Sequence, residues 1–184
     1  PIRKSRQVTG KQMVPDSNQK HPAPCEKLKP PRLLLTLLLV LVAGLALAQP
    51  APQFWIRNLE GQRFDSRKVG EEPIVVSFFF VNCVPCLKEI PKLHAYLSEQ
   101  LPAVHLLFID PLKEDSKQDM IGFAERLGVP QKFFYKDGLG TVSRKFFRGV
   151  QQAFPTIVGI KGRQELFRLS GLLEGALDQI LERL

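Results

Sequence analysis

The sequence predicts an α/β fold for residues 49–184, and three consecutive patterns are the basis for it. Residues 74–81 form an almost continuous apolar run of β-branched and aromatic side chains, typical of a strand buried on both faces. Over residues 87–101, leucine and isoleucine recur with a period near 3.6, as in an amphipathic helix. Residues 104–109 resemble a second strand. Strand, helix and strand with short links form a βαβ unit, so we expect the two strands to be parallel.

The other elements are expected on both sides of this unit. Before it, residues 54–58 resemble a short strand, Leu59-Glu60-Gly61 is a turn signal, and residues 62–64 can pair back as a hairpin. Turn signals and apolar periodicity predict the elements that follow it. They are a helix over 119–127, a short strand over 132–135, a turn at 136–138, a weak helix over 140–147, strands over 156–160 and 164–169, and a terminal helix over 172–184.

Residues 33–48 are sixteen residues without a charge. Three basic residues precede this run, and Ala46-Leu47-Ala48 at its end follows the small-x-small rule of signal cleavage sites. We therefore expect residues 27–48 to be a signal peptide that is cleaved after Ala48. The run is shorter than the roughly 20 apolar residues of a full membrane span, and an uncleaved membrane anchor is the alternative. The basic residues are Lys27, Lys29 and Arg32.

The chain then divides into three parts. Residues 1–26 are polar and lack periodicity, so we expect an unstructured leader or a segment foreign to the natural protein, with Met13 as a candidate start. The signal peptide follows. Residues 49–184 form one domain, which is large enough to bury its own core.

The positive charge of the chain lies mostly in the leader. Residues 1–48 hold eight Lys and Arg and two Asp and Glu, whereas residues 49–184 hold eighteen and sixteen. The domain is therefore close to neutral. Its charge gives no argument for nucleic-acid binding, and we expect no nucleic-acid partner.

Two of the three cysteines stand where the first strand meets the helix of the βαβ unit. Cys83 should cap the helix, where unpaired N–H groups and the helix dipole favour the thiolate. Its pair with Cys86 closes too small a loop to act much as a structural cross-link, so we expect a chemical role. Between them, Val84 and Pro85 should tune the pair, and proline suits the first helical turn. Cys25 precedes the signal and would be lost on cleavage.

A metal site is the alternative interpretation of the Cys-x-x-Cys pair. A zinc site would need two further ligands, but no second cysteine pair follows, and His94 and His105 are isolated in the sequence. We therefore expect no metal and no cofactor. Instead, we expect Cys83 to be the nucleophile that attacks a partner disulfide, and Cys86 to resolve the mixed disulfide that forms.

Three segments carry a family resemblance. They are VVSFFFVNCVPCLKEIPKL over residues 75–93, AFPTIVGI over 153–160, and the LEG turn at 59–61. With the order of the elements, they resemble the exported thiol–disulfide oxidoreductases of the TlpA/ResA/DsbE-like family, over roughly residues 53–184. The resemblance implies a thioredoxin-like fold, in which helices flank a central mixed sheet and a β-hairpin extends the N-terminus.

The chain departs from the family pattern at three places. Asn82 stands where the family usually has tryptophan before the first cysteine, and Ser77 stands where thioredoxin itself carries a buried acid. Residues 153–156 read AFPT instead of the usual GVPT. The first and third departures concern partner preference and redox potential rather than the fold.

The resemblance also implies roles for three residues near the cysteines. Glu89 should lie close to the two thiols and modulate their protonation; the alternative is a first-turn glutamate that the helix dipole favours. Pro155 should follow a cis peptide bond and face the cysteines, unless it is an ordinary trans proline that opens a strand. A cis bond would leave the backbone of Phe154 free to pair with an extended substrate segment.

The function implied is exported thiol–disulfide exchange, in the periplasm or elsewhere outside the cytoplasm. The favoured direction is reduction of protein disulfides, such as those of apocytochrome c during cytochrome c maturation. A membrane electron donor would re-reduce the protein, and we expect a monomer. One alternative is a general extracytoplasmic disulfide reductase or oxidase. Another is a copper-carrying assembly module, although such modules space their cysteines by three residues rather than two.

Overall fold

The computed structural model describes residues 50–184. The expected signal peptide over 27–48, the polar segment 1–26 and Cys25 all lie outside the described residues. Within the described part, no helix combines the length and the apolar character needed to cross a membrane.

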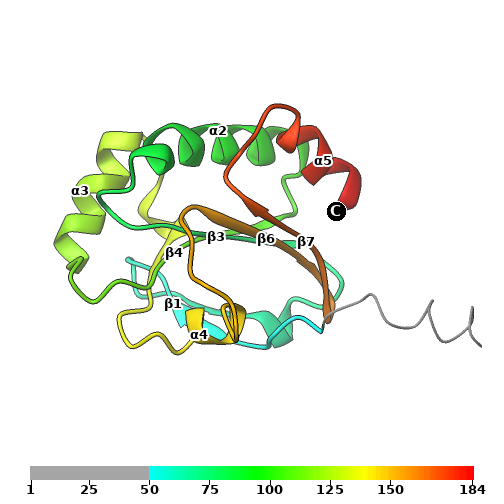
Figure 1. Ribbon diagram of the computed structural model, residues 1–184, viewed down its shortest axis with the longest axis horizontal. Helices are drawn as coiled ribbons and strands as arrows, with labels where there is room; N and C mark the ends of the chain where they lie inside the picture. Colours follow the sequence, from blue (N-terminus) through cyan, green and yellow to red (C-terminus); the bar gives the residue numbers. More distant parts are fainter. Residues whose placement is uncertain (1–49) are drawn as a thin grey trace, which may run out of the picture. The chain divides into compact units, whose positions relative to one another are not determined.

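The described residues form a two-stranded and a five-stranded β-sheet with helices packed on them (Figure 1). The elements, in chain order, are β1 (Trp55–Arg57), β2 (Arg63–Asp65), η1 (Ser66–Lys68), β3 (Ile74–Phe78), α2 (Val84–Gln100), β4 (His105–Asp110), α3 (Lys117–Leu127), η2 (Gln131–Phe133), β5 (Phe134–Lys136), α4 (Ser143–Phe146), β6 (Thr156–Lys161), β7 (Gln164–Ser170) and α5 (Ala176–Arg183).

The central sheet is mixed, with the strand order β5-β4-β3-β6-β7. β3 lies in its middle, parallel to β4 and antiparallel to β6. This confirms the predicted βαβ unit, because β3, α2 and β4 follow one another along the chain. All five residues of β3 are buried, as its continuous apolar run predicts.

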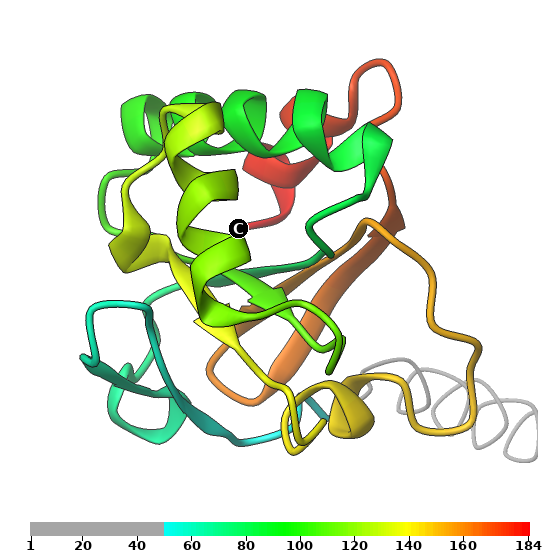
Figure 2. The same cartoon turned by 90° about the vertical axis from the view of Figure 1, so that its left-hand side faces the viewer.

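Helices cover one face of this sheet, and the β1–β2 hairpin with α4 covers the other (Figures 1 and 2). Successive side chains of a strand point to opposite faces. Accordingly, Val75 packs in the cluster that includes residues of α2, α3 and α5, whereas Val76 and Phe78 pack in the cluster under the hairpin. The domain therefore has a hydrophobic core on each side of its central sheet.

The hairpin is confirmed at almost the predicted positions. β1 and β2 pair antiparallel, with Ile56 opposite Phe64. The turn after β1 also reaches the edge of the central sheet, because the amide of Leu59 donates to the carbonyl of Phe134 at 2.9 Å. The hairpin is thus attached beside β5.

The structure corrects several predicted boundaries. β3 ends at Phe78 rather than residue 81, since the chain leaves the sheet before the cysteines, and α2 begins at Val84 rather than residue 87. Proline in the first turn of α2 explains the early start, because its missing N–H has no helical partner to lose. α5 begins at Ala176 rather than residue 172, since Gly171 and Gly175 both adopt positive φ angles.

Candidate active site

Cys83 and Cys86 form a disulfide at the N-terminus of α2. Cys83 is the N-cap residue, with an extended backbone, and Cys86 lies in the first turn, so their Cα atoms are 5.2 Å apart. The amide of Leu87 donates to the carbonyl of Cys83, which closes this turn. Because the first amides of a helix have no partner within it, a negative charge on the Cys83 sulfur would be stabilised here.

Both cysteines are buried in the disulfide form. Cys83 exposes 2% of its surface and Cys86 none, so Cys83 is the more exposed of the two by a small margin only. The residues around them form the outer surface: Asn82 and Pro85 are exposed, and Val84 exposes 68% of its surface. A partner would therefore contact these side chains before it reached the Cys83 sulfur.

A tight turn leads from the central strand to Cys83. The amide of Phe79 still bonds the carbonyl of Ile109 on β4, and the amide of Cys83 bonds the carbonyl of Phe80 at 3.0 Å. Between them, the amide of Val81 donates to the side chain of Asp115 at 2.9 Å. Residues 79–82 are thus held by a backbone contact at one end and by a carboxylate in the middle.

The peptide bond between Phe154 and Pro155 is cis, as predicted. β6 begins at the next residue, Thr156, which pairs with Phe78 at the end of β3. The segments that lead to Cys83 and to Pro155 therefore meet where β3 ends and β6 begins. The rings of Phe80 and Phe154 also pack edge to face, with centroids 5.4 Å apart.

Glu89 lies one helical turn beyond Cys86 and is half-buried. Its carboxylate accepts a hydrogen bond from the amide of Leu172 at 2.8 Å, in the loop after β7. The hydrogen bonds found among the described residues do not join Glu89 to either cysteine. Its contact is therefore with the loop, through a backbone donor that no sequence pattern predicts.

The same loop also contacts Pro155. The amide of Gly171 donates to the carbonyl of Pro155 at 3.0 Å, and the amide of Leu172 donates to Glu89. Two consecutive amides thus connect the cis proline with helix α2. Gly171 and Leu172 were not predicted as part of the site. The sequence signal for them is a glycine directly after a strand.

Sequence analysis also missed two acids beside the cysteine turn, Asp110 and Asp115. Asp110 is the last residue of β4 and is fully buried, and Asp115 is 9% exposed. Burial raises the pKa of Asp110 to about 7, against the opposing effects of the Leu112 amide and the Lys136 ammonium. The signal in the sequence is an acid that directly ends an apolar strand.

The two histidines within residues 50–184, His94 and His105, contact neighbouring side chains of the domain. The ring of His94 packs against Phe133 with centroids 4.7 Å apart, and burial together with Lys132 lowers its pKa. His105 lies 2.6 Å from a carboxylate oxygen of Glu72. Within residues 50–184, no three His, Cys, Asp or Glu side chains are grouped so that they could hold a metal ion.

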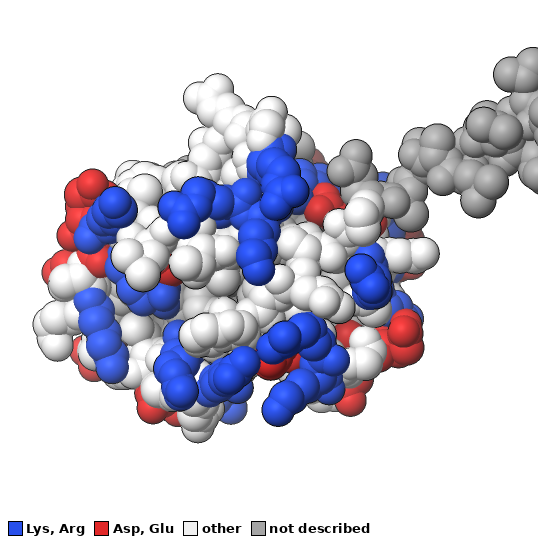
Figure 3. Space-filling view, turned by 90° about the horizontal axis from the view of Figure 1, so that it is seen from below, with Lys and Arg blue, Asp and Glu red and all other residues white. Residues whose placement is uncertain are grey.

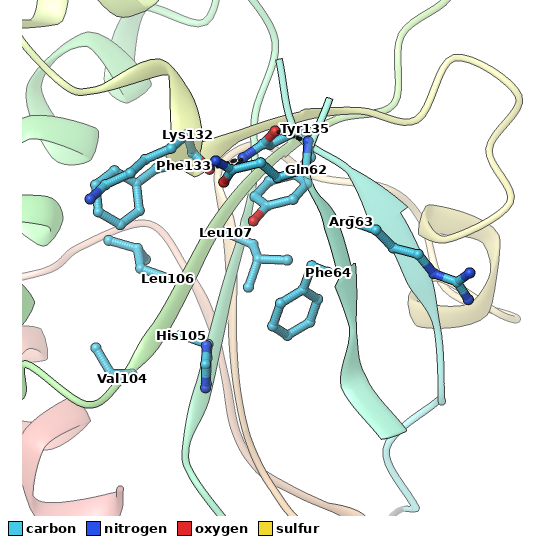
Figure 4. Close-up of a pocket in the computed structure, with 11 residues that line it drawn as sticks. Gln62, Arg63, Phe64, Val104, His105, Leu106, Leu107, Lys132, Phe133 and Tyr135 are labelled. Atoms are coloured by element: carbon cyan, nitrogen blue, oxygen red, sulfur yellow. Dashed lines mark hydrogen bonds between the residues drawn. The ribbon is translucent and has the colours of Figure 1, made fainter. Parts of the chain in front are cut away.

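Two hollows of the surface lie away from the disulfide. One of about 270 Å³ opens between the hairpin and the β4–β5 edge, where Gln62, Phe64 and Tyr135 point toward it (Figure 4). Another, of about 520 Å³, lies beside residues 50–53. Neither of the two is lined by a cysteine.

Lysine and arginine side chains gather on the face that carries the hairpin and α4 (Figure 3). Four of them line the larger hollow together with one acid, Glu165, which pairs with Arg168 at 2.7 Å. α2, with the two cysteines, covers the opposite face of the sheet (Figure 1). The basic face and the disulfide are therefore separate features of the surface. The four basic residues are Lys145, Arg148, Arg163 and Arg168.

The sequence matches no protein-family model and has no significant match to a curated protein. Solved structures are similar to the described domain. A thiol:disulfide interchange protein of the thioredoxin family from Chlorobium tepidum shares 20% identity with a TM-score of 0.63, over 74% of this chain and 96% of its own.

Two further structures support the same fold. A secreted disulfide oxidoreductase of Mycobacterium tuberculosis, described as homologous to Escherichia coli DsbE, shares 20% identity with a TM-score of 0.57 over 72% of this chain and 96% of its own. StoA from Bacillus subtilis shares 16% identity with a TM-score of 0.58 over 71% and 95%. The described domain thus has a thioredoxin-like fold, as expected.

Proposed function

We propose that this protein is a thiol–disulfide oxidoreductase that acts through Cys83 and Cys86. The observation that carries the proposal is their disulfide at the N-terminus of α2, at the sheet edge where the chain also reaches a cis proline. The helix terminus favours a thiolate at Cys83. The exposed Val84 and Pro85 would form the contact surface and tune the pair. The thiol:disulfide interchange proteins that share the fold support this reading.

The reaction runs as two sulfur exchanges. In the reducing direction, the Cys83 thiolate attacks one sulfur of a partner disulfide, and the other partner sulfur leaves as a thiolate that takes up a proton. Cys86 then loses its proton and attacks the Cys83 sulfur of the mixed disulfide. The Cys83–Cys86 bond forms, and the partner leaves as a dithiol. Two electrons pass to the partner, and a thiol donor must return two electrons to the protein.

The segment before β6 would position the partner. The ladder pairings of β6 begin at Thr156, so Phe154 lies outside them. An extended partner segment could therefore pair with the backbone of Phe154, as in strand addition. The Phe154 ring packs on Phe80 of the turn that leads to Cys83, which would bring the partner segment beside the cysteines.

Glu89 would tune the protonation of the two thiols from one turn along α2. A carboxylate near a thiol raises the thiol pKa. Glu89→Gln tests this role, because glutamine keeps an acceptor for the Leu172 amide and removes only the charge. We expect the pH at which Cys83 becomes reactive to fall in the variant. An unchanged reactivity profile would leave Glu89 as a contact of the loop alone.

More specifically, we propose that the protein is exported and reduces protein disulfides, such as the Cys-x-x-Cys-His disulfide of apocytochrome c. Its support is the resemblance of residues 75–93 and 153–160 to the TlpA/ResA/DsbE-like family, together with the signal-like segment 27–48. A membrane donor would then supply the electrons. A Cys83–Cys86 reduction potential of about −270 mV or lower is expected for a reductase, whereas about −120 mV would indicate an oxidase.

The activity is tested with a peptide that carries a Cys-x-x-Cys-His disulfide and with an unrelated disulfide protein. We expect the reduced protein to reduce the peptide, and Cys83→Ser to lower the rate by about a hundredfold or more. Ser98→Ala, at an exposed position of α2, is the control and should retain the rate. Equal rates for the wild type and Cys83→Ser would reject the proposed function, and a preference for the unrelated protein would reject its finer form.

A further inference from the structure

A buried carboxyl lies directly beside the turn that leads to Cys83. Asp110 is fully buried at the end of β4, one residue after Ile109, whose carbonyl bonds the amide of Phe79. Its Oδ1 accepts the amide of Leu112 at 2.8 Å, whereas no donor among the described residues hydrogen-bonds its Oδ2. A buried carboxylate oxygen without a donor is costly, and a proton on that oxygen would remove the charge and create a donor.

Asp115 connects this carboxyl to the cysteine turn. Its Oδ2 accepts the Val81 amide at 2.9 Å, two residues before Cys83. Asp115 is close enough to Asp110 that it raises the pKa of Asp110, both through its charge and as a hydrogen-bonding group. A proton on Asp110 can therefore be shared with the carboxylate that holds the turn.

The other charged groups around Asp110 come from β5, from the segment after it and from α3. Lys136 on β5 places its Nζ 3.5 Å from Asp110 Oδ1 and donates to the carbonyl of Leu112. Asp119 on α3 also interacts with Lys136, although its bonds to Ser116 are the main reason for its lowered pKa. Asp137 bonds the Asp110 carbonyl through its backbone amide, while its carboxylate holds the amides of Val142 and Ser143. Lys136 is thus the single cation among these groups.

We infer that Asp110 and Asp115 form a positioning pair for the proposed exchange reaction, in which one shared proton keeps Asp115 bonded to the Val81 amide and so fixes the turn that carries Cys83. The effect of this pair on disulfide exchange rests on the proposed function. The arrangement of Asp110 and Asp115 does not depend on that function. When the shared proton is lost, two negative charges face each other beside a single lysine. Their repulsion weakens the hold on residues 79–82, and the position of the Cys83 sulfur relative to α2 changes with it.

The reactivity of Cys83 should then respond to two titrations. One is the ionisation of its own thiol. The other is the loss of the shared proton, which the raised pKa of Asp110 places near pH 7. We expect the second step to change the reactivity of the Cys83 thiolate by about threefold or more, since residues that share one hydrogen-bond network are coupled to this extent.

The test measures the rate at which iodoacetamide alkylates Cys83 in the reduced full-length protein between pH 5 and 9, with the modified residue identified by peptide mass. We expect the wild type to show a step near pH 7 besides the thiol ionisation, and Asp110→Asn and Asp115→Asn to lack it. Glu114→Gln is the matched control, because it removes an exposed acid next to Asp115 and should keep the step. A wild-type profile without the step, or an Asp110→Asn profile that retains it, would overturn the inference.

A second measurement needs no variant. In the wild-type protein, the carboxyl carbon of Asp110 and the amide of Val81 should titrate together near pH 7 in NMR spectra. Titration of Asp110 near its ordinary value of 3.8, or a Val81 amide that does not follow it, would contradict the inference. Neither the alkylation rate nor the NMR titration requires a partner disulfide. A protein that shows the step but reduces no partner disulfide would reject the proposed function and keep the acid pair.

Discussion

At the scale of single residues, the surroundings decide the chemistry more than the residue type does. Cys83 and Cys86 were predicted as the reactive pair, and the structure places both at the first turn of α2. Their burial was not predictable from the motif, because the hydrophobic cluster that encloses them includes residues far along the chain, with Phe154 packed against it. Asp110 was missed for the same reason: the sequence shows an acid after a strand but not its enclosure.

The buried acid predicts how stability depends on pH. Asp110 keeps its proton up to about pH 7 in the folded protein, whereas an unfolded chain releases it near 3.8. Between these values the folded state binds more protons, so the free energy of unfolding falls as pH rises, and above about 7 this loss is complete. The shift corresponds to roughly 4 kcal/mol at most. Asp110→Asn should therefore become more stable relative to the wild type between pH 4.5 and 8.

Urea unfolding of both proteins at the two pH values measures this difference. Glu114→Gln serves as the control, since it removes an exposed acid and should keep the wild-type dependence on pH. A difference between wild type and Asp110→Asn that is the same at pH 4.5 and 8 would show that Asp110 titrates normally.

At the scale of elements, the βαβ unit and the hairpins were predictable because each follows from a local pattern. The loop between β7 and α5 was not. The apolar period over 172–184 predicted a helix through this region, but Gly171 has a φ of 82° and Gly175 a φ of 74°, and α5 begins only at Ala176. The loop is held instead by its contacts to Pro155 and Glu89, which no local pattern encodes.

Substitution of Gly171 tests how much the packing of this loop against Glu89 contributes to stability. Gly171→Ala would strain the positive φ and would also place a Cβ 3.3 Å from Glu89 Oε1. Gly175→Ala carries a similar φ strain but meets no atom within 4 Å. We expect both variants to lose about 1 kcal/mol of stability from the strain, and Gly171→Ala to lose more. Equal losses in thermal unfolding would mean that the close approach of the new Cβ to Glu89 costs no stability.

At the scale of the whole molecule, the central sheet separates two hydrophobic cores, and only one of them contains the cysteines. The helical side carries the cysteines, and lysine and arginine side chains gather on the hairpin side (Figure 3). The mixed sheet was predictable from the family resemblance, and the parallel pairing of β3 with β4 was predictable from the βαβ pattern. How the second core closes was not, because it depends on contacts between distant segments, such as the rings of Phe54 and Phe146 with centroids 5.5 Å apart.

The central claim is that Cys83 exchanges disulfides with a partner and Cys86 resolves the product. The most direct measurement is to mix reduced Cys86→Ser protein with the oxidised Cys-x-x-Cys-His peptide and to identify the covalent product by mass spectrometry. We predict a stable mixed disulfide between Cys83 and the peptide, which the wild type resolves and Cys83→Ser does not form. Absence of this adduct, or an adduct on a cysteine other than Cys83, would contradict the account.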